Sequence, residues 1–103
     1  MSKKGTPAKA AKYRMRVISA NGQDTTTEHL SKPNLDTIRK ALNDGYALML
    51  PKHFHGLHAD VWLDEDGEIK HLPANVRGGA EVKWIGDYAL LGNVVIVERI
   101  KAA

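Results

Sequence analysis

Three histidines stand close together in the segment His-Phe-His-Gly-Leu-His, at His53, His55 and His58. Neutral imidazole is a common ligand for zinc, copper and nickel, and in an extended segment His53 and His55 would share one side. However, Pro51 precedes the segment and Gly56 lies within it, which is typical of a surface loop with ordinary histidines. We therefore expect no metal site and no cofactor, although the spacing alone leaves metal binding by these histidines open.

Residue types that support covalent or acid–base catalysis are sparse. The chain has no cysteine, and Ser19 and Ser31 lie in strand and capping contexts rather than in a Gly-x-Ser-x-Gly turn. The acidic run at residues 64–66 precedes Gly67, a composition that favours a solvated turn over a paired catalytic site or a calcium loop. We therefore expect that the protein is not an enzyme.

Positive charge is concentrated at the N-terminal end. The formal net charge is +3, from 15 basic and 12 acidic residues, and four of the basic residues precede the first predicted strand. Without those four, 11 basic residues face 12 acidic ones. Residues 1–12 contain no large apolar side chain beyond Met1, so they cannot offset the entropy of ordering. We predict a flexible basic tail at residues 1–12.

Such a tail could neutralise phosphates without reading base sequence, and its binding would weaken with salt. A lysine-rich end that only improves solubility is the alternative interpretation. The candidate nucleic-acid contacts are the first six basic residues of the chain: Lys3, Lys4, Lys9, Lys12, Arg14 and Arg16.

A β-hairpin is predicted at the start of the folded part. Residues 13–17 alternate apolar and basic side chains, which is the period of a half-buried strand. Asn21 and Gly22 both tolerate the positive φ that a two-residue type I′ turn requires. The threonine-rich segment 23–30 should therefore return antiparallel to the first strand.

One helix is predicted at residues 35–43. Ser31 or Asn34 can cap its first turn, and Gly45 is placed to end it in the left-handed conformation. Its apolar residues fall on a single helical face: Leu35, Ile38, Ala41 and Leu42.

Further strands are predicted from apolar runs. The run at 46–50, ended by Pro51, indicates a strand buried on both faces, and the β-branched run at 94–97 indicates a central strand covered on both faces. Segments 59–63 and 68–72 flank the acidic turn and indicate a second hairpin. The proline and glycines between 73 and 79 indicate irregular chain.

Together these elements predict a single α+β domain at residues 13–103: a twisted, mainly antiparallel sheet of about five strands with one helix, at about 35–43, packed on one face. The other face would then be partly exposed. Three aromatic residues could form an apolar protein-binding patch there, although aromatic residues on strands more often belong to the core. These candidate interface residues are Trp62, Trp84 and Tyr88.

The second half of the chain carries three short motifs: Val-Trp-Leu-Asp-Glu-Asp-Gly at 61–67, Leu-Pro-Ala-Asn at 72–75 and Leu-Gly-Asn-Val-Val-Ile-Val at 91–97. In their order and spacing they resemble a family of short uncharacterised domains from bacteriophages and other mobile elements of bacteria. The resemblance implies a phage or plasmid origin and supplies no catalytic residues. Asn75 and Gly92 are most like the family's recurring positions, and we interpret both as structural, Asn75 capping a loop and Gly92 supplying backbone freedom.

The sequence therefore predicts a small non-catalytic binding module, a phage-type accessory protein that acts through a host-protein or self-association interface. The alternative is a nucleic-acid-binding accessory protein that uses the basic tail. No apolar run approaches the roughly 18 to 20 residues needed to cross a bilayer. We expect no membrane partner and a location in the cytoplasm of a bacterial host.

Overall fold

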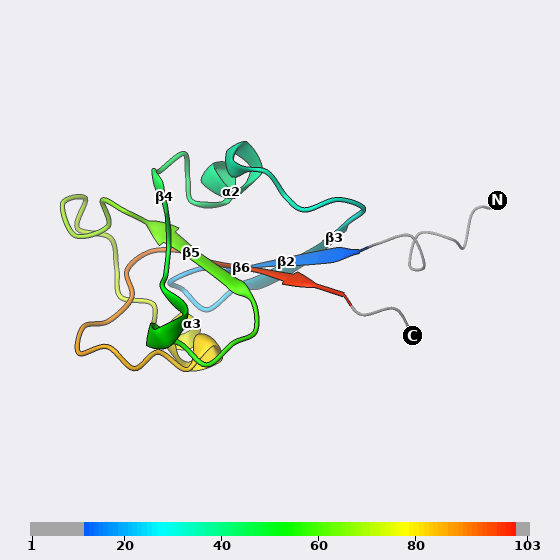
Figure 1. Cartoon of the computed structure of the whole chain (residues 1–103). Helices are drawn as coiled ribbons and strands as arrows, with labels where there is room; N and C mark the ends of the chain where they lie inside the picture. The colour runs from blue at the N-terminus through cyan, green and yellow to red at the C-terminus, as the bar shows by residue number, and fades with distance from the viewer. Residues whose placement is uncertain (1–11, 101–103) are drawn as a thin grey trace.

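The computed structural model of the protein describes residues 12–100, so the predicted tail lies outside the described residues except for Lys12. These residues form one antiparallel sheet of five strands in the order β3-β2-β6-β5-β4 (Figure 1). The strands are β2 (Tyr13–Ile18), β3 (Asp24–His29), β4 (Ala47–Met49), β5 (Asp60–Asp64) and β6 (Val94–Arg99). The predicted α+β class and antiparallel sheet are confirmed.

The described chain contains two α-helices rather than the single predicted one: α2 (Leu35–Ala41) and α3 (Val76–Val82), besides a 3₁₀ turn, η1 (Lys52–Phe54). The helices lie on opposite sides of the sheet (Figure 1). On the α2 side, Val95 and Val97 join a cluster with Ile38, and on the α3 side Ile96 joins one with Val82. The prediction of a single helix on one face is therefore wrong, because α3 packs on the face that was expected to be partly exposed.

Strand β6 is the central strand, as its β-branched sequence predicts. It pairs with β2 on one side and with β5 on the other. Residues 94–97 are between 0% and 3% exposed, so both faces of this strand are covered. The confirmed prediction rests on a simple physical cause, since a strand without a polar side chain is stable only where both faces are buried.

Helix α2 begins as predicted and ends earlier than predicted. The Asn34 side chain accepts a hydrogen bond from the Thr37 N–H at 2.9 Å, which caps the first turn. The last helical residue is Ala41, and Asn43 and Asp44 rather than Gly45 take the left-handed conformation, with φ of 55° and 62°. Gly45 is needed for another reason, because a Cβ there would collide with the Asp64 carboxylate.

Helix α3 replaces the irregular chain predicted at 73–79. The Asn75 side chain accepts from the Gly78 N–H at 2.7 Å, so it caps a helix and not a loop. Its amide also donates to the carbonyls of Ile18 and Gly92 at 2.7 and 2.8 Å. Gly78 packs directly on the central strand, where a Cβ would lie 2.6 Å from a methyl group of Val94. The glycine that suggested a break instead allows close helix–sheet packing.

The second predicted hairpin does not form. Residues 65–72 make successive turns rather than a strand, and the neighbours of β5 in the sheet are β6 and β4. The Lys70 ammonium and the Asp66 N–H both hydrogen-bond the Asp64 carboxylate at 2.8 Å, which holds the chain folded back on the end of β5. The run at 46–50, predicted as buried on both faces, instead contains the edge strand β4.

The first hairpin, β2–β3, is confirmed, but its turn differs from the predicted type I′. The Ser19 N–H donates to the Gln23 carbonyl at 2.8 Å and closes a three-residue loop, 20–22. Of these loop residues only Gly22 has a positive φ, of 93°. A three-residue loop needs one left-handed residue, and glycine adopts that conformation without strain.

Gly92 also has a positive φ, of 75°, as its predicted backbone role requires. No helix within residues 12–100 is long and apolar enough to cross a membrane.

Candidate protein-binding edge

The histidine segment gives no metal centre among the residues that the structure describes, because no three His, Cys, Asp or Glu side chains there are grouped for one. The His53 ring contacts the Phe54 ring at a tilt of 43°, with ring centroids 4.2 Å apart, and His58 is exposed. His55 is buried, and its Nδ1 accepts a hydrogen bond from the Leu57 N–H at 3.2 Å. Burial, with a smaller contribution from Lys52, lowers the pKa of His55 and favours its neutral form.

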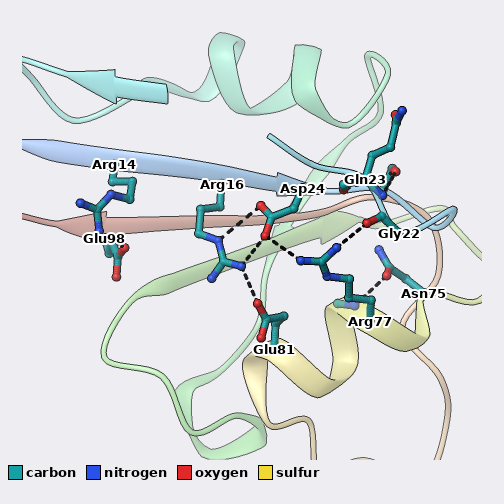
Figure 2. Close-up of polar contacts among 11 residues, drawn as sticks. Arg14, Arg16, Gly22, Gln23, Asp24, Asn75, Arg77, Glu81 and Glu98 are labelled. Atoms are coloured by element: carbon teal, nitrogen blue, oxygen red, sulfur yellow. Dashed lines mark hydrogen bonds and ion pairs between the residues drawn. The ribbon is translucent and has the colours of Figure 1, made fainter. Parts of the chain in front are cut away.

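The two arginines predicted to contact nucleic acid lie on β2, on the α3 side of the sheet (Figure 2). One amino group of Arg16 hydrogen-bonds both Asp24, at 2.6 Å, and Glu81, at 2.5 Å. Arg14 forms ion pairs with Glu98 at 3.1 Å and with Glu28 at 3.8 Å. Each arginine therefore faces two carboxylates of its own chain.

A second arginine completes the cluster around Asp24. Arg77, on α3, forms an ion pair with Asp24 at 3.3 Å and donates to the Gly22 carbonyl at 2.6 Å (Figure 2). The hydrogen bond from Arg16 holds the pKa of Asp24 below its ordinary value, and the hydrogen bonds that Arg16 donates to Asp24 and Glu81 raise the pKa of Arg16. This cluster ties α3 to the β2–β3 hairpin.

The ion pairs change what the predicted basic patch can do. A guanidinium that is neutralised by two carboxylates releases few counterions from a phosphate backbone. Lys12 is exposed, while Lys3, Lys4 and Lys9 lie outside the described residues. Arg14 and Arg16 are therefore poorly suited to bind a phosphate backbone.

The three aromatic residues predicted to form one patch are split between the two faces of the sheet. Trp62 packs with the α2-side cluster, and Trp84 packs with the α3-side cluster. The Trp84 indole donates to the Tyr88 carbonyl at 2.5 Å, and Tyr88 is 84% exposed. Only Trp84 and Tyr88 lie together, so these residues do not form a single surface.

The sequence predicted a strand at 46–50 but not its exposed position at the edge of the sheet. We call residues 46–50 the β4 edge. Strand β4 pairs only with β5. The Glu65 N–H donates to the Tyr46 carbonyl at 2.7 Å, and the Leu50 N–H donates to the Val61 carbonyl at 2.8 Å. Because hydrogen-bonded and non-bonded pairs alternate in an antiparallel ladder, the N–H and C=O groups of Ala47 and Met49 point away from β5.

The β4 edge also presents apolar side chains. Tyr46 is 61% exposed, Leu48 44% and Met49 47%. Leu48 lies opposite Leu63 and so on the α3 side of the sheet, whereas Met49 lies opposite Trp62 on the α2 side. Unpaired backbone groups and exposed apolar side chains therefore occur in the same short strand. A signal for this arrangement was present in the sequence, because proline beside a strand is typical of an edge.

The backbone groups at the two ends of the β4 edge are not available to pair with another strand. The Gly45 N–H donates to the Leu42 carbonyl at 3.0 Å, and the Gly45 carbonyl accepts from Arg39 Nε at 2.9 Å. The Arg39 guanidinium also lies 5.0 Å from the centroid of the Tyr46 ring. At the other end Pro51 has no N–H. The free hydrogen-bonding groups of the edge are thus confined to Ala47 and Met49.

Asp64 lies next to the β4 edge and holds the neighbouring turns in place. Its side chain is 4% exposed and lies at the end of β5, opposite Ala47. Burial raises the pKa of Asp64, but the hydrogen bonds from Lys70 and the Asp66 N–H outweigh that effect and lower it. The ionised carboxylate therefore holds the 65–72 turns against the sheet, beside the glycine that precedes β4.

No protein-family model matches this chain, and no similar protein was found among curated proteins or among solved structures. The class that the fold defines is an open, five-stranded antiparallel α+β domain.

Proposed function

We propose that this protein is a small non-catalytic binding module, a phage-type accessory protein, that acts by contacting another protein through the β4 edge. The observation that carries the proposal is the coincidence of outward backbone groups at Ala47 and Met49 with the exposed side chains of Tyr46 and Leu48. Addition of a strand to a free sheet edge gives affinity through main-chain hydrogen bonds and specificity through alternate side chains.

Two further observations support the proposal. Proteins commonly protect edge strands with charged side chains, yet residues 46–50 carry no charge. Two pockets on the described part of the chain, beside Asp64 and beside Asp60, enclose about 210 and 250 Å³, whereas small-molecule sites usually enclose about 300 to 1,000 Å³. The exposed strand is therefore better suited to recognition than these pockets are.

Site-specific photo-crosslinking tests the proposal. A photoreactive amino acid would replace Leu48 in the full chain expressed in bacteria, and a matched variant would carry it at Thr26, on the opposite edge of the sheet. We expect discrete crosslinked protein products from position 48 only, unchanged by nuclease treatment. The proposal would be wrong if position 48 gave no more products than position 26, or if the products disappeared with nuclease.

A further inference from the structure

Resting on the proposed function, we infer that the partner at the β4 edge is a second copy of this chain. The two copies pair β4 against β4, antiparallel, about a twofold axis at Leu48. Such an interface is isologous, so each copy supplies the same surface and the assembly closes as a dimer. The two five-stranded sheets then join into one continuous ten-stranded sheet.

The backbone of the β4 edge selects this register. Ala47 and Met49 lie symmetrically about Leu48, so antiparallel pairing about Leu48 sets Ala47 of each copy opposite Met49 of the other. Both members of such a pair point outward, and each pair exchanges two N–H···O bonds. A shift of one step in one direction sets Ala47 opposite Ala47 of the other copy and Met49 opposite Gly45. A shift in the other direction sets Met49 opposite Met49 and Ala47 opposite Pro51. The N–H and the carbonyl of Gly45 are both already hydrogen-bonded within the chain, Pro51 has no N–H, and its carbonyl already accepts from the Phe54 N–H. The register centred on Leu48 therefore makes the most hydrogen bonds that the edge allows.

The same register covers the exposed apolar side chains. Residues that oppose one another in antiparallel strands project to the same face, so the two Leu48 side chains meet on the α3 side. Each Met49 lies beside Ala47 of the other copy on the α2 side, and each Tyr46 lies opposite Leu50. Side chains that are 44% to 61% exposed in the single chain thereby gain apolar neighbours.

Charge at the two ends of the β4 edge is complementary under this symmetry. Asp44 precedes the edge and Lys52 follows it, and both are exposed. Antiparallel pairing about Leu48 brings the Asp44 end of one copy to the Lys52 end of the other, twice in each dimer. A parallel arrangement would instead bring like charges together. The strand best suited to pair with the β4 edge is thus β4 of a second copy, running in the opposite direction.

Engineered disulfides test the register directly, because the natural chain has no cysteine. The two Leu48 residues form a non-hydrogen-bonded pair, with Cα atoms about 4.5 Å apart, which is within disulfide range. We expect Leu48→Cys to oxidise almost completely to a covalent dimer under dilute conditions. Thr26→Cys, on the exposed β3 edge, should crosslink only at the rate of random collisions.

A proline substitution at the β4 edge is the second test of the dimer. Met49→Pro removes an outward N–H without removing a bond to β5, so circular dichroism and the thermal transition should stay close to those of the parent. Two intersubunit hydrogen bonds are lost per dimer, and the dissociation constant from sedimentation equilibrium should rise roughly tenfold or more. Thr26→Pro, at the matched outward position of β3, should leave the dimer unchanged.

The outcomes separate this inference from the proposed function. Full crosslinking of Leu48→Cys together with weakened association of Met49→Pro supports the symmetric dimer. A chain that sediments as a monomer at all concentrations, with equal crosslinking of Leu48→Cys and Thr26→Cys, overturns it. In that case crosslinks from position 48 to a different protein would still support the proposed function. The absence of such crosslinks would contradict both the dimer and the proposed function.

Discussion

The two edges of the sheet differ in chemistry although both are open. Strand β3 presents the sequence Asp-Thr-Thr-Thr-Glu-His, with its central residues exposed and polar. Its two acidic residues are tied to arginines of β2. Strand β4 is half as long and presents leucine and methionine. Polar and charged side chains make water a good partner for an exposed edge, whereas apolar ones favour another strand.

This difference indicates that the β3 edge stays exposed to water and that the β4 edge binds another strand. The β3 edge is stabilised within the chain, through the cluster of Arg16, Arg77 and Asp24 that joins it to α3. The β4 edge carries no charged side chain at residues 46–50 and so has no comparable ion pair. The exposed apolar side chains of the β4 edge therefore have no counterpart on β3.

The largest expected effect comes from the strand between the two edges. Val95→Asp or Ile96→Asp would place an unpaired charge in a position that is 0% or 1% exposed, at a cost comparable to the roughly 5 to 15 kcal/mol that stabilises a whole domain. Both variants should lack a cooperative thermal transition in calorimetry. Thr25→Asp on exposed β3 should cost less than about 1 kcal/mol. A normal transition in the Val95 variant would contradict the central position of β6.

A smaller loss is expected on the β3 side when its cluster is broken. Arg16→Met leaves Glu81 unpaired and removes one of the two partners of Asp24, and we expect it to cost about 1 to 3 kcal/mol in denaturant unfolding. Arg14→Met is the matched control, because the Arg14 side chain is 39% exposed against 25% for Arg16 and exposed pairs contribute about 0 to 1 kcal/mol. Equal losses would show that the cluster contributes no more than ordinary surface pairs.

Acid should weaken the β3 side through Asp24. The pKa of Asp24 is lowered in the folded protein, mainly by the hydrogen bond from Arg16. The folded state therefore binds fewer protons than the unfolded state, so this contribution to stability is complete above the ordinary pKa of 3.8 and is lost as the pH falls through the lower folded value. Thermal melts between neutral pH and pH 2 should show a shallower loss in Asp24→Asn than in the parent. Identical slopes would place the acid sensitivity elsewhere.

The smallest expected effect on stability belongs to the β4 edge. Leu48→Glu changes a side chain that is already 44% exposed, so the stability of the single chain should change by less than about 1 kcal/mol. Two glutamates at the twofold axis would repel one another, and association in sedimentation should be lost. A large drop in the melting temperature of the dilute, monomeric chain would instead give Leu48 a structural role.

The sequence predicted the elements whose patterns are local. The alternation at 13–17, the Asn34 cap and the β-branched run at 94–97 each led to an element that the structure contains. Helix α3 was missed because it includes Gly78 and Gly79, which are poor helix formers. It forms because the neighbouring Asn75 caps it and because Gly78 allows contact with Val94, which is distant in the sequence.

The candidate site was harder to predict for the same reason. A run of five apolar residues indicates a strand but not its place in the sheet, and the position of β4 follows from residues 65–72, which fold into turns instead of supplying another strand. The basic residues Arg14 and Arg16 were taken as free, because the sequence alone does not show that Asp24 and Glu81 converge on Arg16.

Amide hydrogen exchange tests the central claim most directly, since it compares the two edges in the unmodified protein. The N–H groups of Met49 and Thr26 both point away from the sheet, on β4 and on β3. We predict that the Met49 amide becomes protected as the protein concentration rises, whereas the Thr26 amide exchanges rapidly at every concentration. Rapid exchange of both amides at high concentration would contradict the claim that the β4 edge binds a second copy.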